Sequence, residues 1–148
     1  CTGCEGCRSS WECVIKDDFA QVVKKTDEAE WIILASPTYW YSVTSDMKRF
    51  IDRCYSLIQF PANRKQWTGK YHGSGKVCVT AAICEQLEPA AMGNTLSLLT
   101  DFSRDIGLDV VESVAASGFF EAGSIKGDGS LLQKAKMAGQ EAFDRING

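Results

Sequence analysis

Four of the seven cysteines lie within the first thirteen residues of the chain. Two, two and five residues separate the successive thiols of this run, which consists of Cys1, Cys4, Cys7 and Cys13. Four cysteine thiolates are the usual ligands of an iron–sulfur cluster, and compact ligand runs place the first cysteines two residues apart. Gly3 and Gly6 let the backbone between the thiols curl tightly. Residues 1–16 are therefore predicted to form a cluster-binding loop, with a four-iron four-sulfur cluster as the favoured occupant.

Three other interpretations of the cysteine run stay open. Structural zinc usually needs two cysteine pairs that are separated by about a dozen residues or more. A disulfide framework suits a small secreted chain, whereas Cys54, Cys78 and Cys84 lie in apolar segments and leave an odd number of thiols. Reduced cysteines without any metal are the third alternative. An iron–sulfur site is favoured over all three.

Composition limits the classes to which the chain can belong. Its 148 residues are 45% hydrophobic and 24% charged, with a net charge of -3, which is typical of one globular domain over residues 1–148. Scattered Lys and Arg residues predict no nucleic-acid partner. No apolar run approaches the roughly 18 residues that span a membrane, and the thiols fit a reducing compartment. We expect a cytoplasmic protein without a membrane partner.

Apolar runs and helical periodicity alternate along the chain. Short, continuous apolar runs predict buried strands at 31–36, 76–82 and 110–117. Helical patterns predict a helix from 17 to about 27, one that starts at Thr44 or Ser45 and extends to 58, one from Pro89 to 106, and one capped by Asp128. This alternation predicts an α/β fold with a parallel sheet between helix layers. Ligands of such sheets bind at the carboxyl ends of the strands.

The loop after the first predicted strand carries three consecutive aromatic residues, Tyr39, Trp40 and Tyr41. Three neighbours cannot all point into the core, so we expect some of them to face a ligand or a partner. Hydroxyl and backbone groups of Thr38 and Ser42 suit the polar edges of a flat heteroaromatic ring such as a flavin. A subunit interface is the alternative, because Tyr and Trp are enriched there, and the two roles are compatible. Phe119 and Phe120 are expected to anchor a later loop locally, and the alternative is that they cover a ligand in a neighbouring subunit.

The segment Ser36-Pro37-Thr38-Tyr39-Trp40, followed by Met47 to Arg53, resembles the flavin-binding region of the flavodoxin-like NAD(P)H-dependent FMN reductase superfamily. Together with the cysteine loop and Asp17-Asp18, it resembles the iron–sulfur flavoprotein branch. The resemblance implies a five-stranded flavodoxin-like sheet, bound FMN and a homodimer or homotetramer. It also implies a cluster on Cys1, Cys4, Cys7 and Cys13, and flavin contacts from two loops: Pro37, Thr38, Tyr39, Trp40, Tyr41, Ser42 and Val43, and Thr80, Ala81 and Cys84.

The resemblance further implies that the first βα unit and the second strand, with the loop that binds the FMN phosphate, precede Cys1. This chain therefore reads as the later part of a longer protein. Loss of the central first strand exposes a strand edge and apolar faces. We expect the 148-residue chain alone to bind FMN poorly, to be marginally stable, or to be accompanied by upstream residues.

The predicted function is that of an FMN-dependent oxidoreductase or electron-transfer flavoprotein. Electrons would pass between FMN and a cluster held close to the isoalloxazine, with NAD(P)H or a ferredoxin as redox partner. No side chain is assigned an acid–base role, and His72 in its loop is given none. Two alternatives remain: an NAD(P)H-dependent FMN or quinone reductase without a cluster, and a non-catalytic interaction module that thiols or metal regulate.

Overall fold

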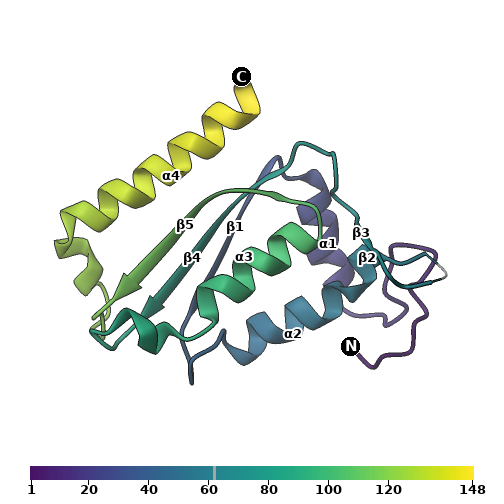
Figure 1. The fold of residues 1–148 in the computed structure, drawn as a ribbon, viewed down its shortest axis with the longest axis horizontal. Helices are drawn as coiled ribbons and strands as arrows, with labels where there is room; N and C mark the ends of the chain where they lie inside the picture. Colours follow the sequence, from purple (N-terminus) through teal and green to yellow (C-terminus); the bar gives the residue numbers. More distant parts are fainter. Residues whose placement is uncertain (62) are drawn as a thin grey trace.

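A three-stranded parallel sheet forms the centre of the molecule in the computed structural model, which describes residues 1–61 and 63–148 (Figure 1). Its strands are β1 (Trp31–Pro37), β4 (Val77–Cys84) and β5 (Asp109–Ser117), in the order β1-β4-β5. β1 and β4 pair in register from Trp31 opposite Val77 to Pro37 opposite Ile83. The three strands predicted from apolar runs are confirmed. The central strand β4 buries most of its consecutive residues because both of its faces are covered.

Helices cover both faces of the sheet. One core cluster joins Leu34 and Cys78 to α1 (Phe19–Glu28), α2 (Ser45–Arg53) and α3 (Thr95–Asp105). A second cluster joins Val77, Val79 and Val114 to α4 (Gly129–Asn147), which lies on the opposite side of the sheet in Figure 1. Neighbouring strand residues enter opposite clusters because side chains alternate along a strand. The predicted three-layer α/β arrangement is confirmed.

Side-chain caps fix two of the helix starts. The hydroxyl of Thr44 accepts a hydrogen bond from Met47 N–H (3.2 Å) at the start of α2. Asp128 accepts one from Leu131 N–H (2.9 Å) at the start of α4. Each cap satisfies a backbone donor that has no partner inside the helix. Both caps are among those that the sequence predicts.

The sequence predicts one continuous helix from Pro89 to 106, and this prediction is wrong because the segment is interrupted. A 3-10 turn, η2 (Pro89–Met92), is separated from α3 by Gly93, whose φ of 57° lies in the left-handed region. A Cβ atom at this position would collide with the backbone carbonyl of Tyr41. The chain leaves helical geometry here because the aromatic loop approaches too closely for a continuous helix.

The end of the second predicted helix also differs. α2 ends at Arg53, and a 3-10 turn, η1 (Cys54–Leu57), leads into β2 (Ile58–Gln59). β2 pairs antiparallel with β3 (Thr68–Gly69). Another 3-10 turn, η3 (Ser124–Gly127), precedes α4. These short elements carry too few residues to show a period in the sequence.

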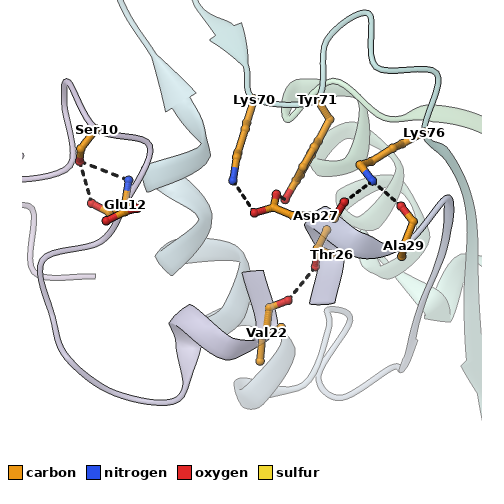
Figure 2. A network of polar contacts seen from close by, with 9 residues as sticks. All are labelled: Ser10, Glu12, Val22, Thr26, Asp27, Ala29, Lys70, Tyr71 and Lys76. Atoms are coloured by element: carbon orange, nitrogen blue, oxygen red, sulfur yellow. Dashed lines mark hydrogen bonds and ion pairs between the residues drawn. The ribbon is translucent and has the colours of Figure 1, made fainter. Parts of the chain in front are cut away.

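Asp27 ties the end of α1 to the segment that precedes β4 (Figure 2). Its carboxylate accepts hydrogen bonds from Tyr71 OH (3.0 Å) and Lys70 Nζ (2.8 Å). Lys76 Nζ donates to the backbone carbonyl of Asp27 (2.8 Å) and to that of Ala29. Burial and the Asp27 carboxylate raise the pKa of the Tyr71 hydroxyl. The network therefore ties the C-terminal end of α1 to the segment that leads into β4.

Apolar side chains remain exposed where β1 forms the edge of the sheet. Trp31 is 44% and Ile33 is 56% exposed, and both alternate with core residues of the α1–α3 side, so they face the α4 side. α4 contacts β4 and β5, which leaves this part of β1 without a covering helix in the described part of the chain. Among the helices of residues 1–61 and 63–148, none is long and apolar enough to cross a membrane.

Candidate functional site

A cavity of about 780 Å³ lies at the carboxyl ends of the three parallel strands. Loops that follow β1, β4 and β5 supply its walls. This is the position at which open α/β sheets bind ligands. Its lining includes the following groups: Pro37 to Tyr41 after β1; Ile83 to Gln86 at the end of β4; Ala91 of η2; and Phe119 to Ile125 after β5.

The aromatic loop is a tight hairpin. Tyr39 N–H donates to Ser42 O (2.9 Å), and Ser42 N–H donates to Tyr39 O (3.2 Å). Trp40 and Tyr41 between them have positive φ values of 51° and 64°, which cost about 1–2 kcal/mol for each residue that is not glycine. Asn94 N–H donates to Tyr41 O (2.9 Å) and holds this geometry. Such strain persists where the surrounding structure over-determines it, and functional sites are enriched in it.

Thr38 fixes the base of the hairpin to the neighbouring elements. Its N–H donates to Ile83 O at the end of β4 (2.8 Å). Its hydroxyl donates to the buried hydroxyl of Thr95 (3.0 Å), which donates to Met92 O (2.9 Å). The wall of the cavity is thereby joined to β4, η2 and α3 at once, and is held rigidly in place.

The opposite wall comes from the loop after β5. Gly118 N–H donates to Gln86 O (2.8 Å), which joins this loop to the end of β4. The Cys84 thiol donates to Gln86 O (3.5 Å) and to Ser117 Oγ (3.6 Å). Phe120 is 76% exposed at the rim. Phe119 and Phe120 line the cavity of their own chain, whereas the sequence favours a local anchor for the loop and, as the alternative, a cover over a ligand in a neighbouring subunit.

The residues that the family resemblance implied as flavin contacts divide into two groups. Pro37, Thr38, Tyr39, Trp40, Tyr41 and Cys84 line the cavity, whereas Ser42, Val43, Thr80 and Ala81 do not. Val43 is buried in the core, and Thr80 is enclosed with Thr100 and Ser113. β4 continues to Cys84, two residues beyond its predicted end. Thr80 and Ala81 therefore lie inside the strand and not in the loop after it.

The cysteine loop surrounds a second, much smaller hollow. Cys1, Cys4, Cys7 and Cys13 line it together with Arg53, Tyr55 and Ser56. Burial, together with the neighbouring Cys13 and Cys4, raises the pKa of the Cys7 thiol. All seven cysteines are free thiols. The other three are buried, and burial raises the pKa of the Cys54 thiol to about 12, so the cysteines divide into a loop set and an inert core set.

The hollow is lined by four thiols, the ligand type of iron–sulfur clusters. Arg53 also lines it, and the buried Nε–H group of this residue has no hydrogen-bond partner among the described atoms. Within residues 1–61 and 63–148, no group of three or more His, Cys, Asp or Glu side chains is arranged to hold a metal ion. The residue types fit a cluster, whereas the sulfur atoms lack ligand geometry in this conformation.

Two arginines hold the cysteine loop in place. Arg64 pairs with Glu5, which also lies 3.9 Å from Arg8. The hydrogen bond from Arg64 lowers the pKa of the Glu5 carboxyl. Arg53 pairs with Asp17 and lowers its pKa in the same way. Neither arginine was predicted at this site, since each contacts residues far away in the sequence and no local pattern marks such pairs.

Comparison with known proteins places this arrangement in a family. The sequence model for NADPH-dependent FMN reductase matches residues 3–97, which is more than half of the chain. The chain belongs to the NADPH-dependent FMN reductase family. One relative in this group, an iron–sulfur flavoprotein of Archaeoglobus fulgidus, is 38% identical over 94 residues, which are 64% of this chain and 40% of that protein. Another iron–sulfur flavoprotein of A. fulgidus is 31% identical over 132 residues, 86% of this chain and 60% of the relative.

The predicted membership of the iron–sulfur flavoprotein branch of this FMN reductase family is confirmed by these relatives. This chain spans 40% and 60% of the lengths of the two relatives. Among solved structures, an FMN-dependent NADH-azoreductase from Bacillus anthracis in complex with FMN superposes with a TM-score of 0.62 at 11% identity. The match covers 84% of this chain and 61% of the azoreductase. RosB gives a TM-score of 0.61 at 14% identity, over 90% and 52% of the chains. These likenesses concern the fold, and confirm the predicted flavodoxin-like class.

Proposed function

We propose that this chain forms part of an FMN-dependent oxidoreductase that passes electrons between FMN and a four-iron four-sulfur cluster on Cys1, Cys4, Cys7 and Cys13. The observation that carries the proposal is the cavity of about 780 Å³ at the carboxyl ends of three parallel strands. Family membership supports FMN as its ligand. The strained aromatic hairpin at its rim supports recognition of a flat ring system.

The lining favours the isoalloxazine ring over the phosphate of FMN. Its described residues include the aromatic side chains of Tyr39, Trp40 and Phe120, and the carboxylates of Glu85 and Glu121, but no Lys or Arg. Aromatic faces suit a flat ring, while a phosphate needs positive charge or converging N–H donors. This composition agrees with the expected weak binding of FMN by the 148-residue chain, because only the ring would be held here.

The residues of the cavity would position FMN without acid–base chemistry of their own. Bound FMN accepts two electrons as a hydride and can release them one at a time. Thr38 holds the hairpin against β4, while the loop of Phe119 and Phe120 forms the opposite wall. NAD(P)H, a quinone or a ferredoxin remain the candidate redox partners. The cytoplasmic location remains a prediction.

The position of the cysteine loop favours a homo-oligomer. The cavity lies before the first turn of α2, whereas the cysteine hollow lies against Arg53 and Tyr55 at the end of that helix. Nine helical residues place about 13 Å between the two ends. Figure 1 shows the N-terminal segment beside the C-terminal end of α2, away from the arrowheads of the strands. We therefore propose that the cysteine loop of a second copy approaches each flavin, instead of the loop in the same chain.

Anaerobic purification followed by assays for flavin, iron and acid-labile sulfide tests the proposal. The expected result is quenching of FMN fluorescence that saturates only at an excess of FMN over protein, with four iron and four sulfide per chain and a mass above that of the monomer. Thr38→Val removes the hydroxyl that ties the cavity wall to Thr95, and it should weaken FMN binding and leave the iron content unchanged. A protein that binds neither FMN nor iron would overturn the proposal.

A cluster-free NAD(P)H-dependent FMN reductase is the second candidate. It is favoured by the lack of metal-ligand geometry within the described residues of the cysteine loop. This alternative predicts FMN binding and oxidation of NADPH with no iron and no sulfide. The same assays therefore separate the two candidates.

A further inference from the structure

The guanidinium group of Arg53 lies at the meeting point of α2, α1 and the cysteine loop. Nη1 and Nη2 donate to the two carboxylate oxygens of Asp17 at 2.6 and 3.0 Å. Nη2 also donates to the Sγ atom of Cys13 at 3.4 Å. The guanidinium carbon lies 4.6 Å from the centre of the Phe19 ring. These contacts leave the Arg53 side chain only 11% exposed.

One donor of this group lacks an acceptor. The Nε atom of Arg53 is buried and has no hydrogen-bond partner among the described residues, while the residue lines the hollow with all four loop cysteines. Buried polar groups in folded proteins are almost always hydrogen-bonded, so an unpartnered one calls for an explanation. A hydrogen-bond acceptor bound in the hollow would explain the unpartnered Nε–H group of Arg53.

A salt bridge to Asp17 does not by itself explain why Arg53 is enclosed. Arg49, one turn earlier on α2, also pairs with a carboxylate, that of Asp46, and its side chain is 74% exposed. A solvent-exposed pair of that kind contributes little to stability. Arg53 differs because it is enclosed, directs its two Nη groups to Asp17 and contacts the sulfur atom of Cys13 through Nη2. This geometry suits an anion rich in sulfur.

We infer that Arg53 is a positioning residue for the iron–sulfur site: it fixes Cys13 through the Nη2–Sγ hydrogen bond and presents its charge and free Nε–H group to the sulfur atoms of the cluster. The inference rests on the proposed function. Hydrogen bonds and positive charge at the sulfur atoms stabilise the reduced, more negative state of a cluster. Arg53 should therefore raise the reduction potential, in addition to holding the loop.

Three variants of the full chain separate this role from simple anchoring. Arg53→Gln removes the charge and the fork, while Arg53→Lys keeps the charge and loses Nε. Asp17→Asn removes a negative charge beside the same guanidinium and leaves its contact with Cys13. Arg49→Gln is the matched control on the exposed side of α2. Iron and sulfide content, circular dichroism and an EPR-monitored titration with dithionite as one-electron reductant are measured for each protein.

The expected result is a more negative potential for Arg53→Gln, by at least about tenfold in the equilibrium constant for reduction, or 59 mV for one electron. Arg53→Lys should show a smaller shift in the same direction, Asp17→Asn a shift to more positive potential, and Arg49→Gln none. If Arg53→Gln loses its cluster, the change in reduction potential of Arg53→Lys tests the inference instead.

An unchanged potential in Arg53→Gln, or in Arg53→Lys where the former loses its cluster, would overturn the inference. So would equal negative shifts in Arg53→Gln and Asp17→Asn, because loosening of the loop explains both. A wild-type protein without iron and sulfide would instead refute the proposed cluster itself. The failure of the inference is thus distinguishable from that of the proposed function.

Discussion

The backbone of Tyr41 occupies the position that a side chain on Gly93 would need. The two residues lie 52 positions apart, and the adjacent Asn94 N–H donates to Tyr41 O (2.9 Å). This contact supports the positive φ values of Trp40 and Tyr41 and interrupts the helix that follows β4. One glycine therefore shapes both the aromatic hairpin and the segment opposite it.

Gly93→Ala should destabilise the hairpin and weaken FMN binding. The new methyl group would collide with Tyr41, and a φ of 57° is unfavourable for alanine, so we expect a loss of at least about 1–2 kcal/mol in the free energy of unfolding. Urea denaturation and FMN fluorescence titration measure the two effects. Gly73→Ala is the matched control, because Gly73 has a φ of 75° but no atom within 4 Å of the added Cβ. If both variants bind FMN equally well, the contact does not support the site.

Trp40→Ala should leave the stability of the isolated chain almost unchanged. Trp40 is 93% exposed, and substitutions of exposed residues usually change stability by less than about 0.5 kcal/mol. We expect a clear loss of FMN affinity or of oligomer mass, since the ring has no packing role in its own chain. Titration and light scattering check this. Met137→Ala, which removes another exposed apolar side chain, from α4, should alter neither quantity.

The sequence predicts those features that depend on local patterns. The apolar runs from Trp31 and from Val77 were recognisable because continuous apolar runs are typical of parallel strands, although the edge strand β1 leaves Trp31 and Ile33 exposed. The break at Gly93 depends on a distant backbone contact. The role of Arg53 depends on partners 36 and 40 residues away. Long-range contacts of this kind have no period along the chain, and only the folded structure brings their partners together.

The candidate site was predictable to a similar extent. The hairpin residues from Pro37 to Tyr41 line the cavity because a strand ends immediately before them. Thr80 lies inside the strand predicted at 76–82, and only the family resemblance implied that it contacts the flavin. The structure extends this strand beyond Ala82, where Ile83 pairs with Pro37. Pairing with the neighbouring strand, and not the run of apolar residues, sets the end of β4.

Asp128→Asn should remove a pH dependence of stability without removing the cap of α4. Hydrogen bonds from Leu131 N–H and Ser130 lower the pKa of the Asp128 carboxyl in the folded chain. A lowered pKa gives stability that is fully present above the unfolded value, about 3.9 for Asp, and is lost as the pH falls through the folded pKa. Asparagine still accepts the hydrogen bond but does not titrate. Urea unfolding of both proteins from neutral pH to pH 3 should show the difference decline only in the acid range. A constant difference would contradict this assignment.

Thr80→Val and Thr38→Val test which threonine belongs to the site. The hydroxyl of Thr80 is fully buried and hydrogen-bonded to those of Thr100 (3.1 Å) and Ser113 (2.8 Å). Its loss leaves buried hydroxyls with fewer partners, and we expect about 1–3 kcal/mol less stability with FMN affinity unchanged. Thr38 lines the cavity, so its variant should lower FMN affinity and lose less stability. Denaturation and FMN titration of the two variants, which make the same chemical change, provide the comparison. If Thr80→Val lowers the FMN affinity more than Thr38→Val does, the ligand binds at the strand and not at the loop. That result would refute the proposed position of the flavin.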